Sequence, residues 1–525
     1  MQSNQSPPIG RLRKGATLAI CCLAAVLLSI DLTALHLAIP VLIEDMDPSA
    51  TQILWIADIY GFALAGLLIT MGSLGDRIGR KKLLLIGSVI FGAASVLTAY
   101  SSSAEMLIAA RALLGAAGAT IMPSTLSIIR NTFTDPRERT TAVGIWSGIS
   151  AAGFVIGPIV GGALLNSFWW GSVFMINLPI MALIFIVGAL VLPESRDPRP
   201  GRLDPISVLL SVAGIIALVY AVKAAADGGL AQPRVALTAA VGVAGIVLFL
   251  RRQTRLTHPL IDVRLFRLPA FSGAIATNMF AMSAMVAQSL IISQYFQLVL
   301  GWSPLKAGLA SLPGAVGGMA GGLLAAPLIT ALGRARTVSL GMVVAAIGMS
   351  MYVLVGVSPD YLKVVMVMIP VGFGISLAFA VTGDTVLASV PKERAGSGAA
   401  ISETAMEIGG ALGVALLGSV LNVAYANSLK VPDGVPNETA PTIKDSIGGA
   451  LHVAASLPEQ LAGAVATAAR HAFVDGLHIT AFAAAFLLLS VALAAWFALR
   501  GVPKVIDDAP ETPDEQPDEP KTLHA

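Results

Sequence analysis

Long apolar runs, separated by short polar connections, dominate the chain from residue 16 to residue 500. A helix needs about 20 mainly apolar residues to cross the hydrocarbon core of a bilayer, and each run has roughly that length. The pattern predicts fourteen membrane-spanning helices, at residues 16–41, 52–73, 83–100, 105–129, 141–165, 172–192, 206–224, 233–250, 270–299, 305–331, 337–356, 361–388, 398–424 and 478–500. We therefore expect an all-α polytopic membrane protein.

The connections between these runs alternate in charge. Arginine and lysine gather after spans two, four, six, eight, ten and twelve, whereas the intervening connections, such as Ser101-Ser102-Ser103, contain few or none. Loops on the cytoplasmic side of a membrane carry an excess of these two residues. The alternation therefore predicts that both termini are cytoplasmic.

Composition agrees with a membrane protein and excludes several functions. Only 12% of the residues are charged, against about 25% in soluble domains. The net charge of +2 is too small to indicate a nucleic-acid partner. The sequence has no G-x-x-x-x-G-K-[ST] loop, no H-E-x-x-H and no Cys/His cluster. We expect no enzymatic activity, no cofactor and no metal site, so that ion gradients must drive any transport.

An internal repeat divides the chain into two related halves. Arg77-Ile78-Gly79-Arg80 after span two is echoed by Ala331-Leu332-Gly333-Arg334 after span ten. Two repeated helical halves, with the substrate site between them, are the plan of many secondary transporters. The predicted organisation is a cytoplasmic N-terminus at 1–15, a six-helix bundle at 16–192, a linker with two inserted transmembrane helices at 193–268, a second six-helix bundle at 269–500 and a disordered acidic tail at 501–525.

The second bundle contains a long outer loop at residues 427–477. Two amphipathic segments, 446–456 and 460–473, predict a helical hairpin that turns at Leu457-Pro458. The hairpin could cap the outer mouth of the bundle or be a solvated projection.

A few charged residues interrupt the apolar spans. A charge at the centre of a membrane helix costs about 2.5–3.5 kcal/mol on insertion scales, so each of them is a candidate functional residue. One interpretation is that the acids only pair with bases and hold helices together. The other is a proton site with a cation site, because burial favours the neutral form of a carboxylic acid and an ionised one attracts cations. The residues concerned are Asp31, Asp58, Asp384, Glu403, Glu407 and the notable intramembrane cation Arg111.

We expect Asp31 to pair with Arg111, and Asp31 and Glu407 to be the leading proton-coupling acids. The cation site is expected to combine carboxylates with aromatic rings, since ring faces attract flat or quaternary cations. Ordinary packing is the alternative for each single ring. The predicted substrate-binding residues are Asp58, Trp55, Tyr60, Trp146, Phe154 and Glu403.

Two further stretches predict conformational roles. Small residues recur along one face of the fifth span and include Gly153, Gly157, Pro158 and Gly161. Such a face allows close helix packing in a membrane, and it could also form the seam along which the halves move, opposite the similar stretch 409–418. In the loop 72–82, Asp76 stands beside Arg77 and Arg80. We expect Asp76 to contact the positive N-terminal end of span thirteen, near Ala395–Ser397.

Together these motifs resemble the fourteen-helix drug:proton antiporters of the major facilitator superfamily, and more narrowly the quaternary-ammonium efflux pump group (the QacA, SmvA and LfrA types). The resemblance implies a cytoplasmic latch at 72–82, a role for Arg111 in proton transfer and an exporter-type fifth span. The chain departs from some relatives because residues 307–332 contain no acid. The motifs that carry the resemblance lie at 31–40, 55–60, 72–82, 111–115, 153–162 and 403–410.

The predicted function is export of lipophilic cations, such as quaternary ammonium compounds, cationic dyes and biguanides, in exchange for protons. Alternating access and protonation of intramembrane carboxylates would drive it, in a monomer surrounded by lipid in the bacterial cytoplasmic (inner) membrane. A transporter of a metabolite or siderophore is the alternative, with a polar pocket at Asn278, Gln288, Gln294 and Gln297. A membrane sensor or scaffold is disfavoured, because the sequence predicts no sizeable soluble domain.

Overall fold

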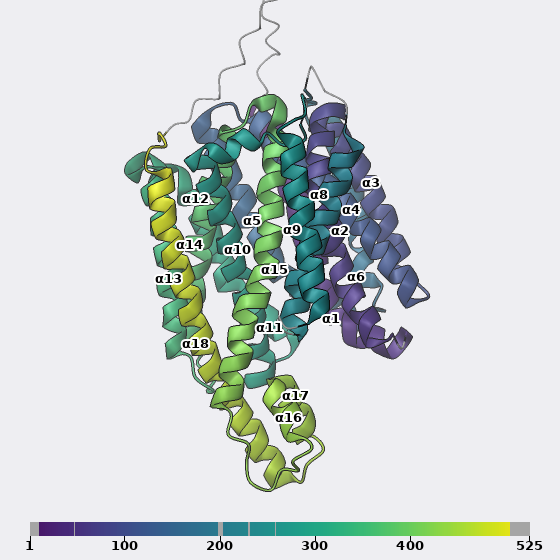
Figure 1. Ribbon diagram of the computed structural model, residues 1–525, viewed down its shortest axis with the longest axis vertical. Coiled ribbons are helices and arrows are strands. Elements are labelled where there is room, and N and C mark those ends of the chain that lie inside the picture. The colour runs from purple at the N-terminus through teal and green to yellow at the C-terminus, as the bar shows by residue number, and fades with distance from the viewer. Residues whose placement is uncertain (1–9, 47, 198–202, 229–231, 258, 505–525) are drawn as a thin grey trace, which may run out of the picture.

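The computed structural model describes residues 10–46, 48–197, 203–228, 232–257 and 259–504. In these ranges every regular element is a helix, and the long helices run side by side along one axis of the molecule (Figure 1). The helices are α1 (Arg11–Met46), α2 (Ala50–Ile78), α3 (Arg80–Ala99), α4 (Ala104–Thr132), α5 (Pro136–Ser167), α6 (Ser172–Met175), α7 (Asn177–Val191), α8 (Pro205–Gly228), α9 (Pro233–Gln253), α10 (Pro269–Gln294), α11 (Pro304–Ala310), α12 (Leu312–Leu332), α13 (Arg334–Ser350), α14 (Tyr361–Ala388), α15 (Ala395–Ser428), α16 (Ala440–Asp445), α17 (Ile447–Ala454) and α18 (Glu459–Leu499), with short 3-10 or π turns at Val263–Arg267, Tyr295–Val299, Met351–Leu354 and Lys392–Arg394.

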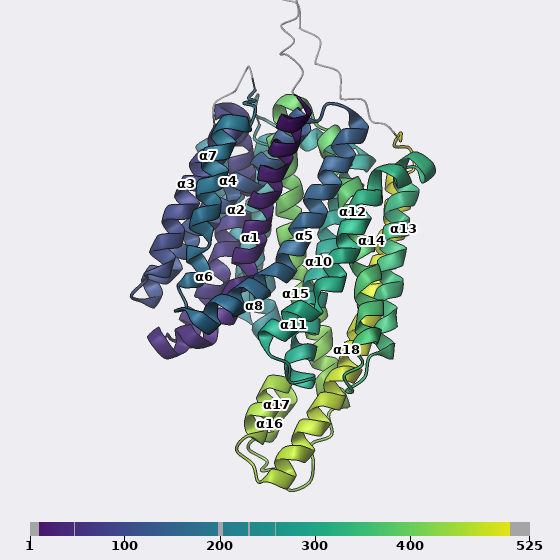
Figure 2. The same ribbon diagram turned by 180° about the vertical axis from the view of Figure 1, so that it is seen from behind.

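Thirteen helical segments of the described chain are long and apolar enough to cross a membrane. The predicted fifth span corresponds to α5, whose 32 residues extend over about 48 Å at 1.5 Å per residue. With α5, the observed helices match the fourteen predicted spans. α1 begins and α18 ends at the same end of the bundle (Figure 2), which we call the termini end. The opposite end is called the hairpin end, and which end faces the cytoplasm stays a prediction.

The two halves of the chain form separate apolar cores. One core lies among α1–α7 and the other among α10–α18. A third cluster lies where the inserted helix α8 meets both halves, and it joins Val219 of α8 to Phe62 of α2 and Ala405 of α15. The inserted helices therefore cover a line along which the two halves meet.

The repeat between the halves is visible in the backbone. α2 ends and α3 begins at Gly79, where φ is 112°, and α12 ends and α13 begins at Gly333, where φ is 85°. Side chains other than glycine rarely adopt such positive φ angles. Both glycines turn the chain sharply, and each places the arginine that follows it, Arg80 or Arg334, inside the protein.

The inserted helices α8 and α9 form a tight pair. A Cβ at Gly245 would meet Gly214 of α8 at 2.9 Å, so the two backbones lie almost in contact. At the termini end, Arg252 donates two hydrogen bonds to Asp204, at 2.6 and 2.9 Å. These bonds hold the pKa of Asp204 below its usual range.

The predicted outer hairpin is only partly correct. Its first helix corresponds to α17, packed against the extended α18. Its second predicted helix, 460–473, is not separate, because α18 runs without a break for 41 residues. At 1.5 Å per residue α18 is about 60 Å long, roughly twice the hydrocarbon thickness. It therefore projects beyond the bundle at the hairpin end, where α16 and α17 lie beside it (Figure 1). The predicted disordered tail, 501–525, lies outside the described residues from residue 505 onward.

The small-residue face of α5 faces a different neighbour from the one we expected. Gly153 and Gly157 pack on α1 within the first half, since a Cβ at either would collide with Ser29 or Thr33. Other residues of α5 meet the second half. The Pro158 ring lies 3.4 Å from the point that a Cβ atom would occupy at Gly308 of α11. Gly161 is also buried.

The stretch 409–418 is not the counterpart of this face. Cβ atoms at Gly409 and Gly413 would collide with the backbone carbonyls of Met279 and Ser283 in α10. Both glycines therefore pack inside the second half, and the expectation that 409–418 lies opposite 153–162 is wrong. The seam partner of α5 is the pair α11–α12, because a Cβ at Gly144 would strike the carbonyl of Gly322.

Candidate functional site

A cavity, which we call the central cavity, lies between the two halves and carries two carboxylates on its wall. Its volume is about 80 Å³, and six helices contribute to it. Methionine side chains make up much of the remaining surface, and such flexible, polarizable side chains adapt to ligands of different shape. The lining comprises Ser29, Met122, Leu126, Val143, Trp146, Ser147, Ser150, Asn278, Met282, Met285, Phe379, Gly383, Ser402, Glu403, Met406 and Glu407.

The two carboxylates have no partner of opposite charge in hydrogen-bonding contact. Glu403 and Glu407 are one turn apart on α15, so their side chains share a face. Among the residues that the structure describes, neither forms a hydrogen bond or an ion pair. Glu403 is only 5% exposed. A pair of uncompensated acids in an apolar cavity can bind a proton or an organic cation.

A second cavity of about 220 Å³ adjoins the first on the side of the hairpin end. Met285 and Phe379 line both cavities. The second lining is mostly apolar, and Leu32 and Thr33 of α1 face the second half across it. The two cavities form a continuous apolar region from the carboxylates toward the hairpin end.

Asp31 and Arg111 form the predicted pair, but they lie inside the first half and not on either cavity. Arg111 donates to the Asp31 carboxylate at 3.4 Å, and Asn177 of α7 donates to its other oxygen at 2.8 Å. The guanidinium carbon of Arg111 is 5.0 Å from the ring centre of Tyr60. Tyr60 is thus a buried contact of this pair and does not line a cavity.

Asn177 lies at the break between α6 and α7. α7 begins at Asn177, after a break that separates it from α6. Pro179 has no backbone N–H, so the carbonyl of Met175 cannot receive the helical hydrogen bond that would join α6 to α7. The side chain of Asn177 is buried, and its amide also donates to Ser95 at 3.0 Å.

Asp58 is paired with a residue that sequence analysis did not single out. Lys223 of the inserted helix α8 forms an ion pair with it. Trp55 stacks on Tyr220 of the same helix at a ring-centre distance of 6.3 Å, and it meets Phe62 edge-on at 6.0 Å. Asp58 and Trp55 therefore lie in the contact between α2 and α8, outside the lining of the central cavity.

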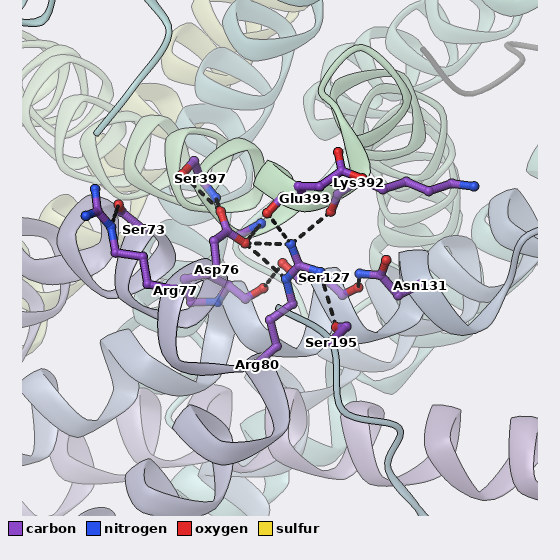
Figure 3. A network of polar contacts seen from close by, with 12 residues as sticks. Ser73, Asp76, Arg77, Arg80, Ser127, Asn131, Ser195, Lys392, Glu393 and Ser397 are labelled. Carbon is purple, nitrogen blue, oxygen red and sulfur yellow. Dashed lines mark hydrogen bonds and ion pairs between the residues drawn. The ribbon is translucent and has the colours of Figure 1, made fainter. Parts of the chain in front are cut away.

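The termini end is closed by contacts between the halves (Figure 3). The Asp76 carboxylate accepts hydrogen bonds from the backbone N–H groups of Gly396 and Ser397, at 2.8 and 2.9 Å. This is the predicted contact with the N-terminal end of α15. Arg80 bonds to Asp76 and donates to the carbonyls of Lys392 and Glu393, at 2.8 and 2.7 Å.

Arg77, by contrast, points away from this junction. Its Nε donates to Ser73 one turn earlier, at 3.3 Å, and the guanidinium lies on the outer side of α2 in Figure 3. Of the two arginines predicted for the latch, Arg80 makes the hydrogen bonds to the second half shown there.

A second junction lies at the same end of the bundle. Asp384 of α14 is fully buried and receives Arg139 of α5 at 2.7 Å and Arg334 of α13 at 2.6 Å. Thr140 donates to the same carboxylate at 3.0 Å. The carboxylate therefore ties both halves together directly beneath Gly383, which lines the central cavity.

The structure gathers some of the predicted site residues and separates others. Trp146, Glu403 and Glu407 share the central cavity, and the backbone of Phe154 lies in α5 while its side chain lies outside the described residues. Sequence analysis missed the partners Asn177, Lys223, Arg139 and Arg334. Lys223 had a usable signal, since it is a cation inside a predicted span.

Comparison with known proteins gives consistent similarities. A family model described as the Major Facilitator Superfamily matches residues 21–414. The chain is 42% identical to "Multidrug efflux pump LfrA" of Mycolicibacterium smegmatis, with 93% of this chain and 97% of that protein covered. It is 34% identical to "Methyl viologen resistance protein SmvA" of Salmonella typhimurium, with 93% and 98% covered.

Solved structures show the same fold at low sequence identity. The human organic anion transporter MFSD10 (TETRAN) superposes with a TM-score of 0.58 at 13% identity, covering 94% of this chain and all of that one. A bacterial homologue of the lysosomal transporter Spinster gives 0.51 at 17% identity, with 96% of this chain and 100% of that chain covered. These similarities concern the arrangement of helices and carry no statement about substrates.

Proposed function

The chain belongs to the major facilitator superfamily and to its drug efflux group, and from this premise we propose that it exports lipophilic organic cations in exchange for protons. The substrates would be quaternary ammonium compounds, cationic dyes and biguanides. The exporter would work in the bacterial inner membrane. The name of one relative supports a cationic substrate, since methyl viologen is a flat organic dication.

The observation that carries this proposal is a pair of acids, Glu403 and Glu407, that lie on the cavity wall with no hydrogen-bonded or ion-paired partner among the described residues. A charge buried in a low-dielectric region is costly unless it is compensated. Each acid is therefore expected to hold either a proton or the charge of a bound cation. The apolar lining and the Trp146 ring suit the hydrophobic part of such a cation.

Coupling then follows from competition for the same carboxylates. A cation entering from the cytoplasm displaces the proton, and a proton arriving from outside displaces the cation. One pH unit across the membrane is worth about 1.4 kcal/mol per proton, which is the drive for an exchange of one proton for one monovalent cation. The Asp31–Arg111 pair would be a further protonation site. Because the pair lies inside the first half, its protonation would change the packing of helices there and would not involve direct contact with the cation.

Alternating access requires the two junctions at the termini end to open. With Asp76 and Asp384 engaged, the cavity is closed toward that end, and the apolar region continues toward the hairpin end. The proposed cycle releases both junctions so that a cation can enter from the termini side.

The alternative of a metabolite transporter receives less support. Of the three glutamines that were expected to form a polar pocket, only Gln288 lines a cavity, and its amide donates to Tyr352 at 3.1 Å. Asn278 lines the central cavity but is held by Ser402 and Thr382. Few polar groups remain to select a polar substrate.

Transport into proteoliposomes tests the proposal. We expect a pH gradient to drive uptake of ethidium by the wild-type protein, and Glu407→Gln to lower the initial rate by about tenfold, equivalent to about 1.4 kcal/mol. Glu459→Gln is the matched control, because this exposed acid lies at the start of α18, far from the cavity. Equal rates with and without the pH gradient, or a Glu407→Gln rate equal to that of Glu459→Gln, would contradict the proposal.

A further inference from the structure

The inserted helix α8 brings a lysine into a setting that suits an organic ammonium ion. The Lys223 ammonium pairs with the Asp58 carboxylate of α2. It also lies over the face of Phe62, 5.3 Å from the ring centre. A cation held by one carboxylate and one aromatic face is the arrangement by which proteins recognise ammonium groups.

Two further rings pack on Phe62 and on each other. Trp55 and Tyr220 stack at 6.3 Å with an angle of 24° between their planes, and Phe62 and Tyr220 meet at 6.2 Å. Trp55 and Phe62 come from α2, whereas Tyr220 comes from α8. We call Asp58, Trp55, Phe62 and Tyr220 the aromatic cage. It exists only because an inserted helix packs on α2.

The lysine is held weakly enough to be displaced. Its side chain is 30% exposed, and that of Asp58 is 25% exposed. An ion pair that water reaches contributes about 0.2–1 kcal/mol. An organic cation with a larger apolar surface can therefore compete with Lys223 for the cage.

The Lys223 ammonium also interacts with a second acid. Lys223 interacts electrostatically with Glu407, which belongs to the central cavity and has no hydrogen-bonded partner among the described residues. Moving from Asp58 toward Glu407 would spare the lysine the cost of an uncompensated charge. The same movement links the cage to the central cavity.

We propose that Lys223 is a tethered competitor, which occupies the aromatic cage in place of the transported cation and helps to expel that cation from it. The inference rests on the proposed function, because it takes the substrate to be an organic cation. The inserted helices then have a role in the transport cycle itself. Lys223 is a positioning residue, since it acts by occupying the site of the substrate.

The kinetic consequence is specific. Without the tethered ammonium, a cation in the cage meets no competitor, so it binds more tightly and leaves more slowly. Removal of the lysine should therefore lower both KM and kcat for transport. A lysine that merely anchors α8 to α2 would give a different result, because its loss would loosen the cage and weaken binding.

Titration calorimetry with tetraphenylphosphonium, on the purified full-length protein in detergent, tests the inference. We expect Lys223→Met to lower Kd by about two- to fivefold, which corresponds to the loss of a competing pair worth about 0.4–1 kcal/mol. Lys223→Arg should keep the wild-type Kd. Asp58→Asn should raise Kd, and the double variant Asp58→Asn with Lys223→Met should match Asp58→Asn, because no carboxylate is left to compete for.

Lys363→Met is the matched control. Lys363 pairs with Asp360 at 3.1 Å, each side chain being 43% exposed, and this pair is outside the cage. Its loss should leave Kd unchanged. An unchanged or higher Kd for Lys223→Met, with wild-type binding intact, overturns the tethered competitor alone. Absence of binding by the wild type for any organic cation overturns the proposed function as well.

Transport kinetics keep the inference falsifiable if Lys223→Met does not fold. Lys223→Gln retains polarity and similar length, and it should lower KM and kcat together for ethidium in proteoliposomes. A fall in kcat with KM unchanged or raised would overturn the proposal, since loss of an anchor and not of a competitor would explain it.

Discussion

Single residues inside the bundle differ mainly in whether their charge is compensated. Asp31 and Asp384 each face arginine, and both also receive a hydrogen bond from a neutral side chain. Glu403 and Glu407 have no such partners in the described chain. Removing one partner from a buried pair leaves an uncompensated charge and costs about 3–5 kcal/mol. The compensated acids are therefore expected to affect conformation and coupling, and the uncompensated ones to affect binding.

Asp31→Asn should separate coupling from binding. The amide keeps the shape of the carboxylate but cannot exchange a proton, and Asp31 lines neither cavity. We expect proton-driven ethidium transport in everted vesicles to fall by about tenfold or more, the effect of about 1.4 kcal/mol. Ethidium binding to the purified variant should change by less than about twofold, equivalent to about 0.4 kcal/mol, because Asp31 contacts neither cavity.

Asn177→Ala provides the comparison for this prediction. It removes the hydrogen bond of 2.8 Å to Asp31 but leaves the titratable group and Arg111 in place. Transport should be reduced less than in Asp31→Asn. Undiminished proton-driven transport by Asp31→Asn would exclude a coupling role for this acid.

The sequence predicts such pairs only where charges are scarce. Asp31 and Arg111 could be matched because Arg111 lies well inside a predicted span. Asp58 and Lys223 could not, since 165 residues separate them. Their pairing depends on where the inserted helix packs, and hydropathy carries no information on that placement.

At the scale of helices, periodicity identifies a small-residue face but not its neighbour. The spacing of Gly153 and Gly157 correctly indicates close packing, yet these glycines contact α1 in their own half. Gly144, about two and a half turns before Gly153 in α5, contacts Gly322 of α12 across the halves. The fourteen spans follow from residue chemistry alone, whereas the pairing of faces follows from the three-dimensional arrangement.

Two alanine substitutions should distinguish these faces. A methyl at Gly157 would overpack the contact with Thr33 inside one half, and overpacking costs about 1–3 kcal/mol. We expect Gly157→Ala to lower the thermal unfolding temperature. A methyl at Gly144 would separate α5 from α12, so Gly144→Ala should instead favour the state that is open at the termini end.

Thermal unfolding and spin-label distances between the halves measure the two effects. Gly157→Ala should keep the wild-type distance distribution between α5 and α12 at the termini end, and Gly144→Ala should populate longer distances. The assignment of faces would be contradicted if Gly157→Ala lengthened these distances and Gly144→Ala did not.

At the scale of the whole molecule, the repeated turn of each half contributes one arginine to closure of the termini end. Arg80 follows Gly79 and joins Asp76 to the carbonyls of the second half. Arg334 follows Gly333 and joins Asp384, which also holds Arg139 of the first half. The repeated turn is visible in the sequence. The pairing of Arg334 with its acid cannot be predicted from the sequence, because the acid lies on a separate helix.

Both junctions close the same opening, so their contributions to it should add. Hydrogen bonds to charged groups are worth about 1.5–3 kcal/mol, and free energies add for separate sites acting on one equilibrium. In a protein with Cys21→Ala, Cys22→Ala and Ser147→Cys, the new thiol lines the central cavity. We expect Asp76→Asn and Asp384→Asn each to speed labelling by an impermeant maleimide about tenfold, and the pair about a hundredfold.

The measurement uses everted vesicles, in which a cytoplasmic termini end faces the reagent. A rigid opening of the two halves requires both junctions to break together, and this makes the effects multiply. If the double variant were labelled no faster than the faster single variant, each junction would open only its own part of the interface. If neither variant were labelled in everted vesicles but both were in right-side-out vesicles, the predicted cytoplasmic location of the termini end would be wrong.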